Sequence, residues 1–403
     1  MSLVVLKFGG SSLKNKKARR AAVNRIEESL QKGNKPIVIV SAIGRKGSAY
    51  ATDTLLELAE NTFKDLDGRE KDLIMSCGEI ISSVIMVQHL KKKAIKAKAL
   101  TGAQAGILTD ENYCNSDVIN INPENVLRLI NKNIVPVIAG FQGISKNGEI
   151  TTLGRGGSDT TASIIAAGLS AKKIEIYTDV EGLLTGDPSI IEKANFLAKT
   201  NYTEACELAY QGAEVIHPAA AEIAMKNKIP IEVRSTFNNK EGTIIDKIGD
   251  KKKLTPITGL ASREDIFYTK VKAHQGINYD NGLQIFELLA DAGISVDFIN
   301  IRESVISFVI NNDKRNLTEK IMSTNGFDFE IHPEYVKISI VGGGMTGQPG
   351  IMARIVNTLH EVGVKIYQTT DSHTVISCLI KEEDKIKALN ALHDAFNLNT
   401  IGG

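Results

Sequence analysis

Short runs of β-branched and other apolar residues alternate with helical stretches along the first 245 residues. The runs at 4–8, 36–40, 135–139 and 174–178 are continuous, as expected for strands buried on both faces of a parallel sheet. A stretch at 15–31 between the first two runs has a helical pattern. This alternation predicts an α/β fold, with a mainly parallel sheet sandwiched by helices.

The last third of the chain contains an internal repeat. Ile285-Phe286 matches Ile355-Val356, Gly293-Ile294 matches Gly363-Val364, and Val305-Ile306-Ser307 matches Val375-Ile376-Ser377, each at an offset of 363 − 293 = 70 residues. A constant offset indicates a duplicated unit. Each copy predicts a helix ended by glycine, then a strand, a turn and a strand. We therefore expect a linker at 246–256, followed by two α+β modules within 257–403.

Length and composition narrow the class of protein. A chain of 403 residues exceeds what one hydrophobic core usually supports, so two or more domains are expected. A net charge of +1 does not suggest nucleic acid or an anionic membrane as a partner. The four cysteines lie far apart, which argues against structural zinc and predicts reduced thiols. We find neither a leader pattern nor an apolar run near the ~20 residues that span a bilayer, so we expect a cytoplasmic protein.

The first candidate motif is the segment Lys7-Phe8-Gly9-Gly10-Ser11-Ser12 at the end of the first predicted strand. Glycines let the backbone approach a phosphate closely, a serine can cap the following helix, and the lysine adds positive charge. Taken alone, the segment is more typical of a strand-to-helix turn with an exposed lysine. Because no Gly-x-x-x-x-Gly-Lys-[Ser/Thr] motif occurs, any phosphate site here is of another kind.

A second motif is Leu153-Gly154-Arg155-Gly156-Gly157-Ser158-Asp159, which leads into a small-residue helix predicted at 160–171. An arginine can grip a carboxylate through two parallel hydrogen bonds, and flanking glycines leave room for a ligand. The motif therefore predicts a carboxylate or phosphate site. The alternative is an arginine in a surface salt bridge.

Two further segments supply acidic side chains. Asp179 and Asp187 follow the strand that ends at Thr178, where ligands bind in open α/β sheets, and either could lie near a phosphate-bound Mg²⁺. The alternative for each is an ordinary turn before Pro188. Glu79 precedes an apolar helix predicted at 80–90 and could pair with an ammonium group, or could simply be a helix N-terminal acid.

Taken together and in order, these segments resemble the aspartate kinases of the amino acid kinase superfamily. The resemblance also includes Ala51-Thr52-Asp53, Ser76-Cys77-Gly78-Glu79, Thr178-Asp179-Val180 and Gly212-Ala213-Glu214-Val215-Ile216-His217-Pro218. The duplicated C-terminal region resembles the tandem ACT domains of those enzymes, including Val341-Gly342-Gly343-Gly344-Met345. The resemblance implies an amino acid kinase catalytic domain at 1–245, ACT regulatory modules, and phosphorylation of the aspartate side chain by ATP as the first step of lysine, threonine, methionine and diaminopimelate biosynthesis.

The resemblance also implies roles for individual residues. Lys7 would neutralise charge on the transferred phosphoryl group, Arg155 would hold the aspartate α-carboxylate, and Glu79 would hold its α-amino group. The remaining substrate residues would be Ser41, Thr52, Ser158 and Asp159. The nucleotide, ATP with Mg²⁺, would be held by Lys7, Phe8, Gly9, Gly10, Ser11, Thr178, Asp179, Leu184, Asp187 and Ser189, with no dedicated protein metal site.

Two positions depart from the family pattern. Ser189 stands where the family commonly has arginine after Asp-Pro, and Glu214 stands where it commonly has lysine. Both changes remove positive charge, so weaker nucleotide binding is expected if those side chains face phosphates. Two alternatives stay open: a kinase for another acidic amino acid, and a catalytically weak amino-acid sensor built on the ACT modules.

The repeat also leads to expectations about regulation and assembly. Each module is too small to bury its own core well, so packing between modules and with a second chain is expected, giving a homodimer or higher oligomer. By resemblance, an amino-acid effector would bind near 295–300 and 365–368, with Ser295, Asp297, Asn300 and Gln368 as candidate contacts. Asp297 is the choice for gripping an ammonium group, with a solvated strand-end acid as its alternative.

A dinucleotide-type fingerprint, Gly342-x-Gly344-x-x-Gly347, follows the strand predicted at 336–341, with Asp371 near the spacing of a ribose-binding acid. Only 403 − 336 = 67 residues follow the start of that strand, too few for two mononucleotide-binding halves. We therefore assign the segment to the second copy of the repeat.

Overall fold

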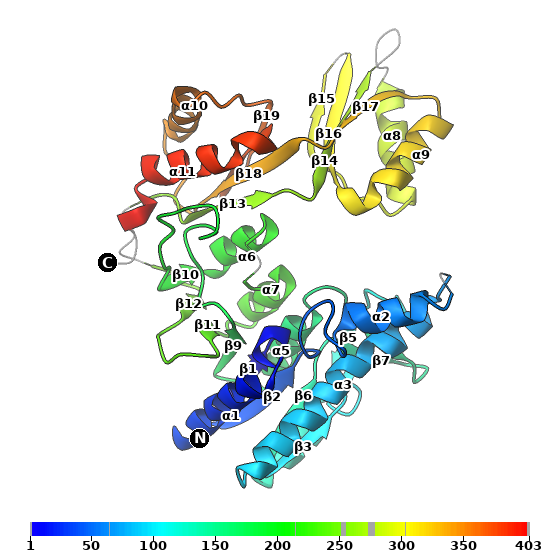
Figure 1. Ribbon diagram of the computed structural model, residues 1–403, viewed down its shortest axis with the longest axis vertical. Helices are drawn as coiled ribbons and strands as arrows, with labels where there is room; N and C mark the ends of the chain where they lie inside the picture. Colours follow the sequence, from blue (N-terminus) through cyan, green and yellow to red (C-terminus); the bar gives the residue numbers. More distant parts are fainter. Residues whose placement is uncertain are drawn as a thin grey trace.

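The computed structural model describes residues 2–63, 65–213, 215–250, 255–272, 279–302 and 304–400, without the side chains of 279–283. Figure 1 shows an α/β domain at one end of the molecule and two smaller α+β modules together at the other end.

The α/β domain is built on an eight-stranded sheet with the strand order β10-β12-β11-β9-β1-β2-β6-β3. Neighbouring strands are parallel except at the antiparallel pair β11 and β12. The strands are β1 (Leu3–Phe8), β2 (Lys35–Val40), β3 (Ala97–Leu100), β6 (Val135–Ala139), β9 (Lys173–Thr178), β10 (Lys199–Asn201), β11 (Ile231–Ser235) and β12 (Thr243–Asp246). The predicted mainly parallel sheet is therefore confirmed.

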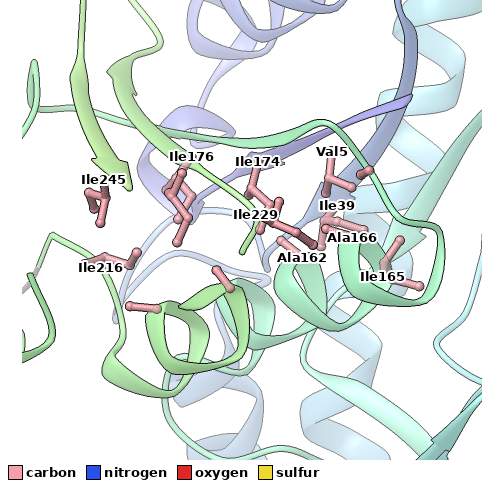
Figure 2. Close-up of a cluster of buried hydrophobic side chains, with 14 of the residues drawn as sticks. Val5, Ile39, Ala162, Ile165, Ala166, Ile174, Ile176, Ile216, Ile229 and Ile245 are labelled. Atoms are coloured by element: carbon pink, nitrogen blue, oxygen red, sulfur yellow. The ribbon is translucent and has the colours of Figure 1, made fainter. Parts of the chain in front are cut away.

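Successive strand residues point to opposite faces of this sheet. Because apolar residues occupy both faces, helices cover both of them. Val5, Ile39 and Ile174 face α5 on one side, as Figure 2 shows, whereas Val4 and Leu6 join a second core with α1 and α3 on the other side. The helices are α1 (Lys16–Gln31), α2 (Thr52–Glu60), α3 (Gly68–Lys92), α4 (Glu124–Asn131), α5 (Gly157–Gly168), α6 (Tyr202–Tyr210) and α7 (Pro218–Lys226), with a 3₁₀ turn η1 at Gly10–Ser12.

A smaller sheet lies beside the main one, with the order β5-β4-β7-β8. Its strands are β4 (Ile107–Thr109), β5 (Val118–Ile121), β7 (Gln142–Ser145) and β8 (Ile150–Thr152). Strand β8 ends directly before the segment that carries Arg155, so this sheet sets the starting point of that loop.

Helix α3 is longer than the sequence suggested. By length and composition it could cross a membrane, contrary to our expectation that no such run exists. It packs against α1, β3 and β6, and Met86, Val87 and Leu90 are buried there. It also buries the polar side chains of Asp72, Ser76 and Glu79. We conclude that α3 is a core helix of the α/β domain.

Each C-terminal module is a four-stranded antiparallel sheet with two helices. The first has the order β15-β16-β14-β17 and the second β13-β18-β20-β19. The first contains β14 (Ile266–Lys272), α8 (Tyr279–Asp291), β15 (Asp297–Ile301), β16 (Val305–Asn311), η2 (Asn312–Lys314), α9 (Arg315–Thr324) and β17 (Asp328–His332). The second contains β13 (Gly259–Arg263), β18 (Tyr335–Val341), α10 (Ile351–Glu361), β19 (Gln368–Asp371), β20 (Val375–Lys381), η3 (Glu382–Asp384), α11 (Lys385–Ala395) and η4 (Leu398–Thr400).

The two modules are interleaved along the chain. Strand β13 precedes the whole first module in sequence but pairs with β18 of the second. It therefore takes the place that β17 has in the first module, beside the strand that opens the repeat unit. The offset of 70 found in the sequence holds from β16 to β20, which begin at Val305 and Val375, but the repeat did not reveal this exchange of the fourth strand.

Candidate active site

Lys7 and Asp159 form an ion pair at the carboxyl end of β1. The Lys7 Nζ lies 2.6 Å from the Asp159 carboxylate, and both side chains are 12% exposed. Lys7 is the next-to-last residue of β1, and Asp159 lies in the first turn of α5. The sheet and the helix thus hold opposite charges at a partly open position where an anionic ligand could compete for the lysine.

The glycines after Lys7 follow a tightly packed path. The Gly9 amide donates to the carbonyl of Tyr177 on β9 at 3.2 Å. A Cβ on Gly10 would lie 2.3 Å from the carbonyl oxygen of Gly44, so no other residue fits there without movement. Phe8 is buried and stacks on Tyr177 with ring centroids 4.9 Å apart, and Ser11 is buried in η1. The segment is a fixed part of the fold.

Glu79 lies well inside α3, which begins at Gly68, and its side chain is buried. Our alternative that it is a helix N-terminal acid is therefore wrong. One oxygen, Oε1, accepts from the amide of Ala42 at 2.9 Å, whereas Oε2 is buried without a hydrogen-bond partner in the described structure. Burial raises the pKa of Glu79 to about 8, although the Ala42 amide and nearby Lys7 counteract this. A cationic group at Oε2 would satisfy this carboxylate.

Two other predicted substrate residues lie on segments beside Glu79. Ser41 follows β2 and its amide donates to the carbonyl of Phe8 at 3.1 Å. Thr52 is the first residue of α2 and is half-buried. Close packing holds these segments on α3, since a Cβ on Gly78 would lie 2.8 Å from the Ala42 side chain and 3.0 Å from the Tyr50 carbonyl.

The glycine-rich segment around Arg155 turns sharply into α5. Gly154 and Gly156 have left-handed φ values of 69° and 68°, which other residues adopt only at a cost. Helix α5 begins at Gly157, three residues before the predicted start, so Ser158 and Asp159 belong to its first turn. Ser158 is buried against Gly140 at the end of β6. Arg155 itself is exposed.

A cleft of about 1010 Å³ brings Arg155 together with the predicted nucleotide residues Thr178, Asp179, Leu184 and Asp187. Arg45 also lines it and lies 3.5 Å from the Asp179 carboxylate. The opposite wall comes from β13 and the residues after it, 260–265. The cleft therefore lies between the α/β domain and the C-terminal modules.

Asp187 makes the turn contacts that were its alternative explanation. Its carboxylate accepts from the amide and the hydroxyl of Ser189 at 2.8 and 2.7 Å. Ser189 is exposed at the edge of this turn. The other departure from the expected pattern, Glu214, lies outside the described residues.

Sequence comparison matches residues 2–235 to the Amino acid kinase family and residues 330–394 to an ACT domain. Aspartokinase 1 of Bacillus subtilis (strain 168) is 44% identical over 404 residues, covering 99% of this chain and 100% of the relative. Aspartokinase of Geobacillus stearothermophilus is 37% identical, covering 99% and 98%. The chain belongs to the aspartokinases. It is therefore a kinase that phosphorylates aspartate and carries ACT regulatory domains.

Solved structures agree with the fold of this aspartokinase. Escherichia coli aspartokinase III in complex with aspartate and ADP has a TM-score of 0.80 at 21% identity, covering 98% of this chain and 100% of that one. The aspartate kinase of Clostridium acetobutylicum has a TM-score of 0.72 at 26% identity, covering 98% and 100%. The match extends through the catalytic domain and both ACT modules.

His217 is a site residue of the aspartokinase to which the sequence motifs assigned no role. Its ring lies against Gly156, where a Cβ would be 2.0 Å from the ring. Burial lowers the pKa of His217 and Lys7 lowers it further, while Asp159 acts in the opposite direction. His217 thus packs on the Arg155 turn, near enough to Lys7 and Asp159 for their charges to affect its pKa. The conspicuous His217-Pro218 dipeptide at the start of α7 was the available signal.

The predicted effector residues divide into two groups. Asp297 is half-exposed and forms a 2.6 Å ion pair with Lys337 of the second module. Burial alone would raise the pKa of Asp297, but the hydrogen bond and charge of Lys337 lower it overall. Gln368 is buried, accepts from Tyr268 and Ser307, and donates to the carbonyl of Phe298. Asp297 and Gln368 thus join the two ACT modules, whereas Ser295 is exposed and Asn300 is half-buried on β15.

The glycine-rich segment after β18 is part of the second ACT module. A Cβ on Gly342 would lie 2.1 Å from the carbonyl of Pro256, and the Gly344 amide donates to that same carbonyl at 3.3 Å. The glycines therefore allow close packing of the chain at 256, which agrees with our rejection of a dinucleotide site.

Proposed function

We propose that this aspartokinase transfers the γ-phosphoryl group of ATP to the side-chain carboxylate of L-aspartate in the region between Lys7 and Arg155, in the cytoplasm. A carboxylate acceptor is already ionised at neutral pH, since the side-chain pKa of aspartate is about 3.9, so the reaction needs no general base. The protein must instead align two anions and reduce their repulsion. Lys7, Arg155 and the backbone amides of the glycine segments supply that positive charge.

The observation that carries the proposal is the position of Lys7 beside Glu79 and Asp159. Lys7 is near enough to affect the pKa of Glu79 and is paired with Asp159. One oxygen of Glu79 is buried without a hydrogen-bond partner among the described residues, which is costly unless a donor arrives. The α-amino group of aspartate would satisfy this oxygen and leave its side-chain carboxylate free to face the phosphoryl group near Lys7.

ATP fits the cleft beside Arg155. The resemblance assigns the nucleotide to Thr178, Asp179 and the loop 184–189, and six of these residues line the cleft with Arg45 and Arg155. Mg²⁺ is typically held by nucleotide phosphates with one or two protein carboxylates and several waters, and Asp179 and Asp187 are the acidic residues of this set. Bound there, Mg²⁺ would reduce the charge of the phosphates. Arg45 and Arg155 add positive charge to this cleft.

The role of Arg155 is tested by the variant Arg155→Lys. Lysine keeps the charge but cannot make two parallel hydrogen bonds to a carboxylate. We expect the KM for aspartate to rise about tenfold or more, with a small change in the KM for ATP. A rise in the KM for ATP alone would instead place Arg155 in the nucleotide site. The test separates the two roles because Arg155 lines the same cleft as the predicted nucleotide residues.

We further propose that an end product of the aspartate pathway regulates the enzyme through the ACT modules, in a homodimer or higher oligomer. Escherichia coli aspartokinase III has been solved in complex with lysine and aspartate. The candidate contacts here are Ser295, Asp297, Asn300 and Gln368. Because Asp297 already pairs with Lys337, an effector ammonium group at Asp297 would have to replace or share that ion pair.

Binding of an effector can be tested by calorimetry with lysine, threonine and methionine, and with diaminopimelate, each with and without aspartate and a non-hydrolysable ATP analogue. Coupling between two binding sites is reciprocal, so an effector that weakens aspartate binding must itself bind more weakly when aspartate is present. Absence of binding by these three amino acids and by diaminopimelate would remove the regulatory proposal and leave the kinase activity unaffected.

A further inference from the structure

A buried carboxylate on α3 lies outside the set of residues assigned to the substrates. Asp72 is 0% exposed. Its two oxygens accept from the amide of Cys114 at 2.9 and 3.1 Å. They also accept from the amide of Thr152 at 2.9 Å and from its hydroxyl at 2.6 Å. A buried carboxylate that accepts from this many donors fixes the groups that donate to it.

The groups that Asp72 fixes lead directly to Arg155. Thr152 is the last residue of β8, and only two residues separate it from Arg155 along the chain. Cys114 has a left-handed φ of 68°, an uncommon conformation outside glycine. The next residue, Asn115, packs on the Arg155 turn, since a Cβ on Gly154 would lie 2.5 Å from its Oδ1. The amide of Ser116 donates to the Thr152 carbonyl at 2.8 Å and closes this small assembly.

Asp72 and Glu79 lie on the same helix. They are 79 − 72 = 7 residues apart, about two helical turns, so both side chains project from the same side of α3. Glu79 faces the position proposed for the substrate ammonium group, and Asp72 holds the base of the loop that carries the arginine proposed for the substrate α-carboxylate. One rigid helix therefore sets the spacing between the two groups that would bind the ends of the amino acid.

We propose that Asp72 is a positioning residue for aspartate binding, acting through Thr152 and Cys114 on the Arg155 loop. The inference rests on the proposed function, because it assumes that Glu79 and Arg155 bind the two ends of the substrate. Asp72 has no role toward ATP in this account. Its loss should therefore change aspartate binding selectively.

The first test is the variant Asp72→Asn, which keeps the size of the side chain and replaces one acceptor oxygen by an NH₂ group facing N–H donors. We expect the KM for aspartate to rise about tenfold or more and the KM for ATP to stay within about twofold. Calorimetry of aspartate binding without ATP should show the same loss, independently of turnover.

A second variant covers the case in which Asp72→Asn does not fold. Thr152→Val removes only the hydroxyl donor and keeps the shape of the side chain and its backbone N–H. We expect a smaller rise in the KM for aspartate, about threefold to tenfold. The KM for ATP should again be unchanged.

Two control variants separate positioning from general stability. Asp110→Asn alters a half-buried carboxylate that accepts from the amides of Asn112 and Asp117 in the same loop and makes no hydrogen bond to Thr152 among the described residues. Val87→Ala removes buried volume from α3 itself, away from Asp72. Both controls should leave the KM for aspartate within about twofold of the parent enzyme, although Val87→Ala should lower the melting temperature.

The outcomes distinguish this inference from the proposed function. A folded Asp72→Asn or Thr152→Val variant with an unchanged aspartate KM would overturn the positioning role. So would an equal rise of the aspartate KM in Val87→Ala, since the effect would then be one of stability. If the parent enzyme did not phosphorylate aspartate, the proposed function would fail before the variants were compared.

Discussion

At the scale of single residues, the site is held by buried polar groups whose partners come from distant parts of the chain. Lys7 of β1 pairs with Asp159 of α5, Glu79 of α3 accepts from Ala42, and His217 packs on Gly156. Each contact joins segments that surround the carboxyl edge of the sheet. The site is thus set by the packing of helices on that edge.

Glu79 provides a prediction about pH. Its pKa of about 8 in the folded protein lies above the ordinary value of 4.5, so the fold without substrate favours the protonated acid. Because the unfolded chain loses this proton near pH 4.5 and the folded chain keeps it to about pH 8, the contribution of Glu79 to stability falls across that interval. An ammonium ligand needs the ionised form, so aspartate affinity should rise with pH up to about 8.

The measurement is calorimetry of aspartate binding from pH 6 to 9 in the parent enzyme and in Glu79→Gln, in buffers of different ionisation enthalpy. The parent enzyme should release a proton on binding below about pH 8, and the variant should bind weakly with little pH dependence. Equal pH profiles for the two proteins would show that Glu79 does not receive the ammonium group.

Sequence motifs identified many of these residues but not their partners. The glycine segment after Lys7 and the loop around Arg155 were recognised from residue type and order. His217 and Asp72 were not assigned, because each gains its role from contacts with residues far along the chain. For Asp72 these are Cys114 and Thr152.

At the scale of elements, the strands and helices of the sheet could be predicted from hydrophobic patterns. Strand β6 at Val135–Ala139 matches the predicted run, and α1 begins after Asn15, whose side chain accepts from the Ala18 amide. Helix α3 was predicted from 80, because the apolar pattern is clear only there. In the structure this helix starts at Gly68. Its first half was missed because it buries polar residues such as Asp72 and Ser76, which break the apolar pattern.

The turn before α5 leads to a prediction at this scale. In Gly156→Ala the new Cβ would lie 2.0 Å from the His217 ring, in addition to the cost of a left-handed φ of 68°. We expect kcat/KM for aspartate to fall about a hundredfold or more, because the Arg155 loop and His217 cannot both keep their positions. Enzyme assays and thermal melting of the purified variant provide the measurement.

Gly148→Ala is the matched control for this variant. Gly148 also has a left-handed φ, 87°, but apart from its chain neighbours no atom of the described residues lies within 4 Å of a Cβ placed there. Gly148→Ala should lose only the stability that a left-handed φ costs a residue with a Cβ, about 1–2 kcal/mol, and should keep its activity. Similar activity in the two variants would contradict the proposed role of the turn.

At the scale of the whole molecule, the second ACT module is joined directly to the loop assigned to the nucleotide. Thr185 of that loop is buried, its hydroxyl lies 2.8 Å from His393 Nε2 of α11, and its carbonyl accepts from Leu260 of β13 at 2.8 Å. Ile191 contributes to the core of the module. A shift of the module therefore moves one wall of the cleft and the loop itself.

This connection predicts the effect of His393→Leu, which removes the hydrogen bond to Thr185 while filling most of the space. We expect the KM for ATP to rise about threefold to tenfold and the KM for aspartate to change little. The control is Leu392→Ala, which removes buried volume from the neighbouring position of α11 and should lower stability without changing the KM for ATP. An unchanged KM for ATP in His393→Leu would show that the contact is only structural.

The arrangement of the modules was the least predictable part of the fold. The repeat indicates that two similar units exist. It does not indicate that β13, which precedes the first module, pairs with the edge of the second module's sheet. Gly259 of β13 lies opposite Val341 of β18, and the neighbouring Leu260 amide donates to Thr185 of the catalytic domain. Such long-range pairing leaves no mark in local hydrophobic periodicity.

The most direct test of the proposed activity is a coupled assay of ADP formation with ATP, Mg²⁺ and either L-aspartate or L-glutamate, for the parent enzyme and Lys7→Ala. Aspartate should be phosphorylated with a kcat/KM at least about a hundredfold above that for glutamate. Lys7→Ala should fold and lose about 10²–10³-fold in kcat, because the lysine acts on charge in the transition state. Equal turnover of both amino acids, or a folded Lys7→Ala variant with full activity, would contradict the proposed activity and the role of Lys7 in it.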